Sequence, residues 1–266
     1  MRSILKQRRA IVFAASLAAC LAGGAHNRCC AAPAEAPLPP PGQGVFEARH
    51  TTGPITVDGV LDEADWSRAQ PFALVDLWDK SPPGDRGPMY ALWDAEYVYF
   101  ACDFTDSDLY AKVMKHDGKT WYDDVFEVFL KPAEGETPYF ELHITPGNVT
   151  MDLKVPHPGD HTFEEQIKWE SKFSAAAHLK GTLNTPGDRD EGWTAEMRIP
   201  WAAFAPVAEP PKAGDRWLFA GCRYDYTAHE DGPLHFSTAR FKFLGFHRTH
   251  EYDWLQFQSG KRELDE

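Results

Sequence analysis

The sequence lacks several features that mark large classes of protein. Basic residues are outnumbered, with 27 Lys and Arg against 40 Asp and Glu, so the basic stripe that a nucleic-acid partner requires is missing. The five cysteines form no CxxC or histidine–cysteine pattern of the zinc type. No segment keeps a long helical period, and no apolar run is long enough to span a bilayer. These absences argue against a nucleic-acid-binding protein, a zinc module and a membrane-spanning protein.

The first part of the chain has the pattern of an export signal. A basic start is followed by an apolar run over residues 10–22, which ends near the tetrapeptide L-A-A-C at residues 17–20. This tetrapeptide resembles a bacterial lipobox, in which the signal is cut before the cysteine and the cysteine is lipidated. We predict a signal peptide over residues 1–24 and a lipid anchor on Cys20, which places the protein in the cell envelope, periplasmic or at the cell surface. Cleavage a few residues later is the alternative and gives a soluble secreted protein.

The composition then divides the chain into a tether and a domain. Residues 25–46 are rich in Ala, Pro and Gly, which predicts a flexible tether. Residues 47–260 have a length that suits one β-rich domain. Of the five cysteines, only Cys102 and Cys222 lie in this domain. Export permits a disulfide between them, but each lies in a strand-like apolar run, so two buried free thiols are an equal expectation.

Short runs of alternating polar and apolar residues fill the domain and predict β-strands. The clearest runs are Met89–Trp93, Tyr97–Phe104, Val125–Leu130, Tyr139–Ile144, Val149–Val155, Trp193–Ile199, Trp217–Tyr226 and Trp254–Phe257. Further strands are predicted at Ile55–Val57 and Phe241–Phe246, and single helical turns at Leu61–Trp66 and Pro200–Phe204. About ten short strands at this spacing predict an all-β fold, an antiparallel β-sandwich of the jelly-roll or immunoglobulin-like type with short helical turns.

Two of these runs carry polar side chains on one face. In Val125–Leu130 and Tyr139–Ile144 the alternation places aromatic and aliphatic residues on one side and Glu127, Glu141 and His143 on the other. A turn-rich link joins the runs and allows them to pair as antiparallel neighbours. The two carboxylates and the imidazole are therefore predicted to share one face of the sheet.

An aromatic residue stands at the edge of this polar face. Trp121 comes directly before the first of the two strands and lies outside its apolar alternation. A flat ring beside hydrogen-bonding groups is what a sugar needs, because the ring takes its C–H surface and the polar groups take its hydroxyls. If the meander continues into the next strand, Asp152 joins the polar face.

Seven segments, each weak alone, resemble a known family in their order and spacing. They are I-T-V-D-G-V-L-D-E-A-D-W, L-W-D-A-E-Y-V-Y-F, W-Y-D-D-V-F-E-V-F-L, Y-F-E-L-H-I, G-T-L-N, G-W-T-A-E-M-R-I-P-W and F-H-R-T-H-E-Y-D-W-L-Q-F. From about Ile55 to Phe257 the chain resembles the carbohydrate-binding module family 9-like domains of xylanases and of many exported bacterial proteins. The resemblance implies a β-sandwich that binds sugar, often at a chain end, between two aromatic plates.

The resemblance also implies roles for single residues. Trp121 matches the first plate, and Glu127 matches the polar partner that follows it. The second plate falls on Phe246, where a tryptophan is expected, which implies weaker stacking. His143 falls where the xylanase modules have a sugar-bonding arginine, and imidazole offers fewer donors than guanidinium. Arg223 matches an arginine common in the exported single-domain relatives.

Metal binding is implied only by the resemblance. Family members bind calcium structurally, and Asp106 and Asp124 are the candidate ligands here, although no EF-hand-like spacing surrounds them. The sequence alone predicts no cofactor.

Three functions follow from these observations. The first is a non-catalytic protein that captures a poly- or oligosaccharide, in support of carbohydrate catabolism by partner glycoside hydrolases. The second is a glycoside hydrolase in which Glu127 and Glu141 act as the carboxylate pair. The third is a haem-binding sandwich with His143 and either Met114 or Met151 as axial ligands. We predict the first, because strand carboxylates need not have unequal pKa values and the family's role is binding.

Overall fold

A computed structural model describes residues 42, 44–78, 86–132, 137–160, 162–227 and 232–260. The predicted signal peptide, the predicted lipidation site at Cys20 and most of the predicted tether lie outside these residues. The first strand begins at Val45, inside the range predicted as tether, so the folded part includes Val45 and Phe46. Within the described ranges, no helix has the length and apolar character needed to cross a membrane.

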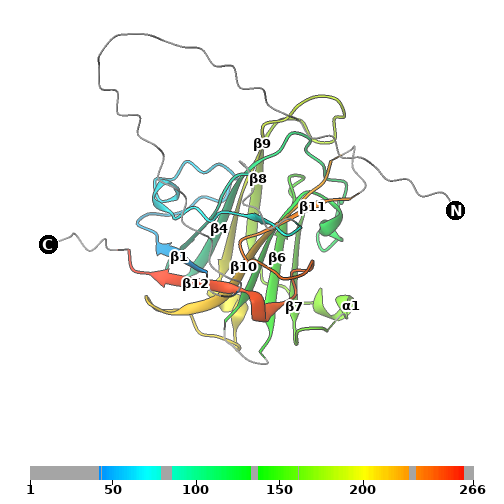
Figure 1. Ribbon diagram of the computed structural model, residues 1–266. Helices are drawn as coiled ribbons and strands as arrows, with labels where there is room; N and C mark the ends of the chain where they lie inside the picture. Colours follow the sequence, from blue (N-terminus) through cyan, green and yellow to red (C-terminus); the bar gives the residue numbers. More distant parts are fainter. Residues whose placement is uncertain are drawn as a thin grey trace, which may run out of the picture. The chain divides into compact units, whose positions relative to one another are not determined.

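Short strands dominate the described part of the chain (Figure 1). The strands are β1 (Val45–His50), β2 (Val75–Asp76), β3 (Met89–Trp93), β4 (Tyr97–Thr105), β5 (Val125–Lys131), β6 (Tyr139–Ile144), β7 (Thr150–Val155), β8 (Ser174–Lys180), β9 (Gly192–Pro200), β10 (Arg216–Asp225), β11 (Leu234–Ser237) and β12 (Asp253–Gln258). The helical turns are η1 (Trp66–Arg68), η2 (Thr120–Tyr122), α1 (Phe163–Gln166), η3 (Trp201–Phe204) and η4 (Thr249–Glu251). The all-β prediction with short helical turns is confirmed.

The strands form one sheet that folds over itself into two layers. Its order is β7-β6-β5-β10-β12-β1-β3-β4-β9-β8, with β11 and β2 attached beside β10. Alternate residues of β5 and β6, such as Phe126 and Leu142, share an apolar cluster with Phe100 and Met197 from β4 and β9. We call this cluster the inner core. The predicted sandwich is therefore present, but it is not wholly antiparallel, because β1 runs parallel to both β12 and β3.

Two predicted strands are absent from the described residues. Ile55–Val57 and Phe241–Phe246 are irregular, although Ile55, Phe241 and Phe246 are buried as a strand pattern would require. Side chains take the place of a strand partner for the backbone. The Thr56 amide donates to Glu63 at 2.7 Å, and the Lys242 amide donates to Glu251 at 2.7 Å. The apolar pattern of the sequence alone therefore predicted the wrong element at these two places.

The two domain cysteines are buried and free. Cys102 lies in the inner core, whereas Cys222 lies in a second cluster on the outer face of β5, β6, β7 and β10. The sheet itself separates them, which excludes the disulfide and leaves the alternative of two buried thiols. Burial raises the pKa of both thiols well above the ordinary range.

The Asp58-Gly59 turn is held by a buried carboxylate of β9. Glu196 accepts hydrogen bonds from the amides of Asp58 and Gly59 at 3.1 and 2.9 Å, and from the Trp66 indole at 2.8 Å. Gly59 has φ +86°, and a Cβ there would lie 2.7 Å from the carbonyl carbon of Ala177. Only glycine fits this turn, which explains why the D-G pair precedes the helical turn at Trp66.

We expect the Glu196 carboxyl to make folding sensitive to pH. Its burial, with a smaller effect from the Glu63 charge, raises its pKa from 4.5 to about 7 against the three hydrogen bonds. An acid with a raised pKa in the folded state stabilises fully below pH 4.5, and this stabilisation is lost as pH rises to about 7. Urea unfolding should be measured below and above this pH window. Between the two, the free energy of unfolding should fall less for Glu196→Gln than for the unchanged protein. Glu63→Gln is the control, and equal pH dependence in the unchanged protein and Glu196→Gln would contradict the assignment.

Candidate functional site

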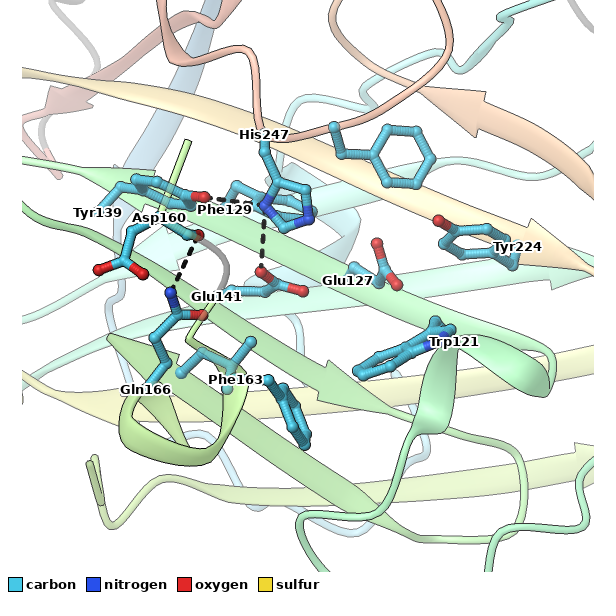
Figure 2. A pocket seen from close by; sticks show the side chains of 12 residues that line it. Trp121, Glu127, Phe129, Tyr139, Glu141, Asp160, Phe163, Gln166, Tyr224 and His247 are labelled. Atoms are coloured by element: carbon cyan, nitrogen blue, oxygen red, sulfur yellow. Dashed lines mark hydrogen bonds and ion pairs between the residues drawn. The ribbon is translucent and has the colours of Figure 1, made fainter. Parts of the chain in front are cut away.

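A cavity of about 260 Å³ opens on the outer face of β5, β6, β7 and β10 (Figure 2). Its lining residues are Trp121, Glu127, Phe129, Tyr139, Glu141, Leu153, Asp160, Phe163, Gln166, Tyr224, Phe246 and His247. Beneath and around it lies the second apolar cluster, which we call the outer core: Leu77, Phe129, Tyr139, Met151, Leu153, Val155, Ala220, Cys222, Ala239, Phe241, Phe246 and Tyr252. Four residues predicted for the site, Trp121, Glu127, Glu141 and Phe246, meet in this cavity.

Trp121 forms one wall of the cavity. It lies in η2, directly before β5, and its carbonyl accepts a hydrogen bond of 2.9 Å from the Tyr226 hydroxyl. The half-buried indole meets the Phe163 ring edge to face, with centroids 5.3 Å apart at 89°. The backbone anchor and the ring contact fix the indole, while its unburied part remains available for a ligand.

Phe246 lines the same cavity but is much less accessible. Only 3% of it is exposed, because its ring packs against those of Tyr224, at 5.2 Å, and Phe241, at 5.9 Å. Phe246 therefore behaves mainly as an outer-core residue whose surface reaches the cavity. Tyr224 and Tyr139 supply further aromatic surface.

Glu127, Glu141 and His143 lie together on one face, as their alternation predicted, with the two glutamates lining the floor of the cavity and His143 buried beside them. The His143 Nε2 atom is 2.8 Å from Glu141 Oε1 and 3.4 Å from Glu127 Oε1. The other ring nitrogen, Nδ1, is 2.8 Å from the hydroxyl of the buried Thr120. In Figure 2 both carboxylates point into the space between His247 and Trp121.

This polar face is buried and not open to bulk solvent. Glu127, Glu141 and His143 are 1%, 3% and 0% exposed. The register between β6 and β7 places Leu153 opposite Glu141 and Met151 opposite His143. Directly opposed residues share one face of a sheet, so these apolar side chains accompany the polar ones.

Asp152 does not join the polar face. It pairs with Leu142, an inner-core residue, and therefore points to the other side of the sheet. Its carboxylate accepts a hydrogen bond of 2.5 Å from the Ser171 amide. The prediction failed because it aligned polar residues with polar residues, whereas the β6–β7 register opposes Leu142 to Asp152.

The two buried glutamates have opposite electrostatic surroundings. Burial, and then the neighbouring charge of Glu141, raises the pKa of Glu127 well above its ordinary value. Burial acts in the same direction on Glu141, but the charges of His247 and His143 and the His143 hydrogen bond hold its pKa below the ordinary value. The surroundings therefore favour the protonated form of Glu127 and the ionised form of Glu141.

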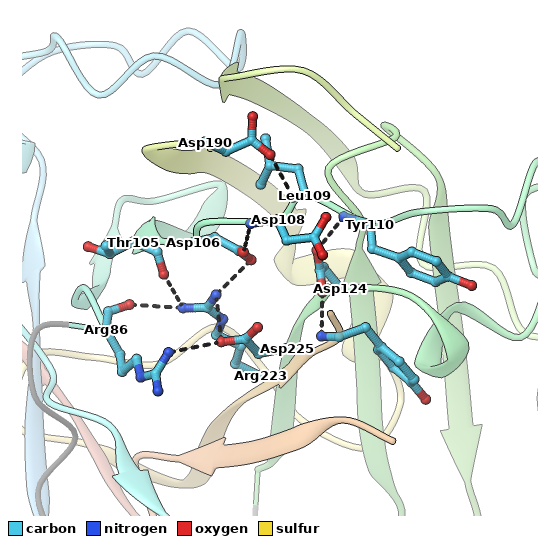
Figure 3. Close-up of polar contacts among 11 residues, drawn as sticks. Arg86, Thr105, Asp106, Asp108, Leu109, Tyr110, Asp124, Asp190, Arg223 and Asp225 are labelled. Atoms are coloured by element: carbon cyan, nitrogen blue, oxygen red, sulfur yellow. Dashed lines mark hydrogen bonds and ion pairs between the residues drawn. The ribbon is translucent and has the colours of Figure 1, made fainter. Parts of the chain in front are cut away.

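Arg223, the remaining predicted sugar contact, lies on the opposite face of β10. The β10–β5 register pairs Cys222 with Glu127 and Arg223 with Phe126, which belongs to the inner core. The guanidinium is fully buried and donates to Asp106 at 2.8 Å, and it lies 4.6 Å from the Phe104 ring centroid (Figure 3). The structure therefore does not bring Arg223 to the cavity.

Asp106, Asp124 and Asp225 form a buried acidic cluster around this arginine (Figure 3). Asp124 accepts hydrogen bonds of 2.6 Å from the amides of both Tyr110 and Tyr226, as expected for a residue that bonds backbone at a strand entrance. The structure brings the two sequence-predicted calcium ligands together.

The cluster nevertheless fits a calcium ion poorly. Arg223 lies 2.8 Å from Asp106 and 3.2 Å from Asp225, so a guanidinium already stands where a cation would bind. Both carboxylate oxygens of Asp106 also accept hydrogen bonds, from Arg223 and from the Asp108 amide. A calcium site needs several oxygens free to converge on the ion. Calcium binding stays a prediction from the resemblance.

Sequence reasoning missed several cavity residues. Asp160, Phe163 and Gln166 come from the loop and short helix after β7, where no pattern indicated a site. His247 also lines the cavity, and its Nδ1 atom is 2.8 Å from the Tyr139 hydroxyl and 3.7 Å from Glu141 Oε2. Tyr224 reaches the cavity because it alternates with Cys222, which pairs with Glu127 in the β10–β5 register.

Comparison with known proteins agrees with this architecture. The carbohydrate family 9 binding domain-like family matches residues 57–231. Endo-1,4-beta-xylanase A of Thermoanaerobacterium saccharolyticum is 23% identical over 154 residues, which is 58% of this chain and 11% of the xylanase. The chain thus spans about a ninth of that relative's length.

Solved structures show the same fold. A family 9 carbohydrate-binding module of Caldicellulosiruptor kristjanssonii in complex with cellotriose has a TM-score of 0.55 at 11% identity, covering 84% of this chain and 98% of the module. The structure with glucose has a TM-score of 0.56 at 12% identity, covering 84% and 100%. The family match covers more than half of the 266 residues and includes β5, β6, β7 and β10, the strands on which the cavity opens. The chain therefore belongs to the carbohydrate family 9 binding domain-like family.

Proposed function

We propose that the cavity beside Trp121 binds a saccharide and does not cleave it. The observation that carries this proposal is the half-buried indole fixed at the wall of a cavity whose floor is polar. Glu127, Glu141, Gln166 and His247 offer hydrogen-bonding groups to hydroxyls, and the ring surfaces suit a sugar's C–H face. Membership of the family and the cellotriose and glucose complexes of the structural neighbours support the same ligand class.

The cavity volume favours a short stretch of glycan. About 260 Å³ is slightly below the usual range for small-molecule sites, so the enclosed part of the ligand is one or two sugar rings. We propose a poly- or oligosaccharide whose remaining units lie outside the cavity. Phe246 replaces the larger ring expected at the second wall and is nearly buried, which favours modest affinity.

A glycan-array screen of the chain without residues 1–24 tests this function. We expect retention on a β-linked glucan or xylan, unchanged by a calcium-selective chelator if Arg223 provides the cationic partner of the acidic cluster. Loss of binding with the chelator would instead support structural calcium. No retention on any glycan would contradict saccharide binding.

The cellular setting is a further proposal. We propose that a lipid anchor on Cys20 holds the domain at the cell envelope, where it presents glycan to glycoside hydrolases. The xylanase relative supports this context, because its matched stretch is part of a longer enzyme. Movement of Cys20→Ser from the membrane fraction to the soluble fraction tests the anchor, and the secreted form is the alternative.

Glycoside hydrolysis is the second candidate, because the pKa values of Glu127 and Glu141 are pushed in opposite directions. The geometry opposes it, since both carboxylates lie side by side on the floor, on neighbouring strands, and His143 contacts both. Cleavage needs the two groups to flank the bond. We expect no reducing ends from xylan or cellulose; release that Glu127→Gln abolishes would overturn this.

The haem-binding alternative has less support. Both ring nitrogens of His143 already have partners, in Thr120 and Glu141. Met114 is 84% exposed and lies outside the cavity lining, and the Met151 sulfur is 3.8 Å from the Thr120 hydroxyl. A visible absorption spectrum of the purified protein tests this alternative, and we expect no haem band.

A further inference from the structure

We propose that Glu127, Glu141 and His143 bind a first-row divalent cation, for which Zn²⁺ is the best match, at the floor of the cavity. This inference goes beyond saccharide binding and does not depend on it, because the ion can bind with or without a glycan.

The distances among the three side chains suit such an ion. Each residue offers one ligand atom, and these atoms lie within 4.8 Å of one another. The His143 Nε2 atom is 2.8 Å from Glu141 and 3.4 Å from Glu127. Zinc bonds of about 2.0–2.2 Å place neighbouring ligand atoms of a tetrahedral site about 3.3 Å apart. Small side-chain shifts therefore bring all three atoms onto one ion.

A second observation points to a ligand at this position. Glu141 is only 3% exposed and lines the cavity, yet its Oε2 atom has no hydrogen-bond partner among the described residues. The His247 Nδ1 atom lies 3.7 Å from Oε2, beyond hydrogen-bonding distance. A buried carboxylate oxygen without a donor is strongly unfavourable. A cation that the Glu141 carboxylate holds through both oxygens gives Oε2 the partner that it lacks.

The surroundings of His143 orient it for metal binding. Its Nδ1 atom is 2.8 Å from the Thr120 hydroxyl, which is fully buried and is also 3.8 Å from the Met151 sulfur. If the hydroxyl donates to the sulfur, it accepts the Nδ1 proton. Loss of the proton on Nε2 then leaves a lone pair that faces the two carboxylates. Metal-binding histidines are commonly held in this way by a hydrogen bond to the other ring nitrogen.

The cavity completes the site. Glu127 and Glu141 both line it, so an ion held between them has a coordination position open toward the cavity for water or a ligand hydroxyl. The charges also match, because two ionised glutamates and one neutral imidazole carry two negative charges that a divalent ion neutralises. Binding replaces the proton shared between Glu141 and His143 and releases protons to the solvent.

The donor set favours zinc over calcium. An imidazole nitrogen with two carboxylates suits Zn²⁺ and its neighbours, whereas calcium takes six or more oxygen ligands. A third group of His and acidic residues, His116, Asp152 and Glu170, provides a comparison. In that group His116 and Glu170 are exposed. The His116 imidazole lies 3.7 Å from Glu170 and 4.0 Å from Asp152, farther than His143 lies from either glutamate.

Equilibrium dialysis of the untagged full chain against Zn²⁺ tests the proposal, with Co²⁺ absorption as an independent readout. We expect one tightly bound ion, an intense Co²⁺ band that Zn²⁺ abolishes, and binding at least tenfold weaker in His143→Gln and Glu141→Gln. Thr120→Val should weaken binding by about tenfold or more through the lost hydrogen bond. His116→Gln, in the exposed group, should bind as the unchanged protein does.

The proposal is overturned if the chain binds no Zn²⁺, if only calcium binds, or if His116→Gln loses the ion while Glu141→Gln keeps it. If His143→Gln does not fold, the Co²⁺ spectrum and Thr120→Val still decide, because neither removes a ligand. All measurements are made without glycan, so failure of saccharide binding leaves this result unaffected.

Discussion

Trp121→Ala should abolish retention on a bound glycan while the protein remains folded. The indole forms one wall of the cavity, and aromatic anchors of this kind contribute about 2 kcal/mol or more to binding, which corresponds to at least about 30-fold in affinity. In the folded state it is half-buried at the edge of the outer core, where it meets the rings of Phe163 and Tyr122. We therefore expect the free energy of unfolding to change by only about 1 kcal/mol.

Tyr122→Ala is the matched control for this variant. Tyr122 is the next residue of η2, is 58% exposed and does not line the cavity. Affinity electrophoresis in a gel containing the glycan, together with thermal unfolding, separates the two effects. If Trp121→Ala unfolds, or if Tyr122→Ala loses as much affinity, the indole is a structural residue and the cavity wall lies elsewhere.

Arg223→Met should be the most destabilising of the substitutions considered, at about 3–5 kcal/mol. The change removes the only fully buried positive charge beside Asp106 and Asp225 among the described residues, at 2.8 and 3.2 Å. Two carboxylates then stay buried with the half-exposed Arg86 as their remaining partner, 3.4 Å from Asp225. Arg216→Met, at the exposed end of the same strand, should change the unfolding free energy by less than about 1 kcal/mol.

The pH dependence of this destabilisation shows whether it comes from the lost charge or from lost packing. Burial and the Asp225 charge raise the pKa of Asp106 to about 6, against the effect of Arg223. Without the arginine that pKa rises further, so the stability difference between Arg223→Met and the unchanged protein should shrink as pH falls toward 6 and stay constant below it. A difference independent of pH would show that lost packing against Phe104 dominates.

The sequence predicted the local half of this site and missed the rest for a physical reason. Period-two alternation placed Glu127, Glu141 and His143 on one face, because side-chain direction within a strand is a local property. Which residues cover that face depends on register and on loops distant in sequence. Leu153 and Met151 arrive through the β6–β7 register, and these long-range pairings have no local signature.

Arg223 shows the same limit. The family resemblance suggested a sugar contact, but strand parity relative to Glu127 sets the side on which it lies, and that parity depends on the β10–β5 register. Burial was also beyond sequence reasoning. An acidic residue in an alternating strand is usually solvated. Glu127 and Glu141 are buried because the outer core covers this face of β5, β6 and β7.

The parallel pairing of β1 with β12 joins the first strand of the domain to the last. Val45 pairs with Trp254 and Arg49 with Gln258, so the first strand is sandwiched between the last strand and β3. During synthesis, β1 cannot pair with β12 until nearly the whole domain has been made. Such a high contact order predicts slow folding, and a chain interrupted before β12 presents unsatisfied backbone on β1 and β10 to other molecules.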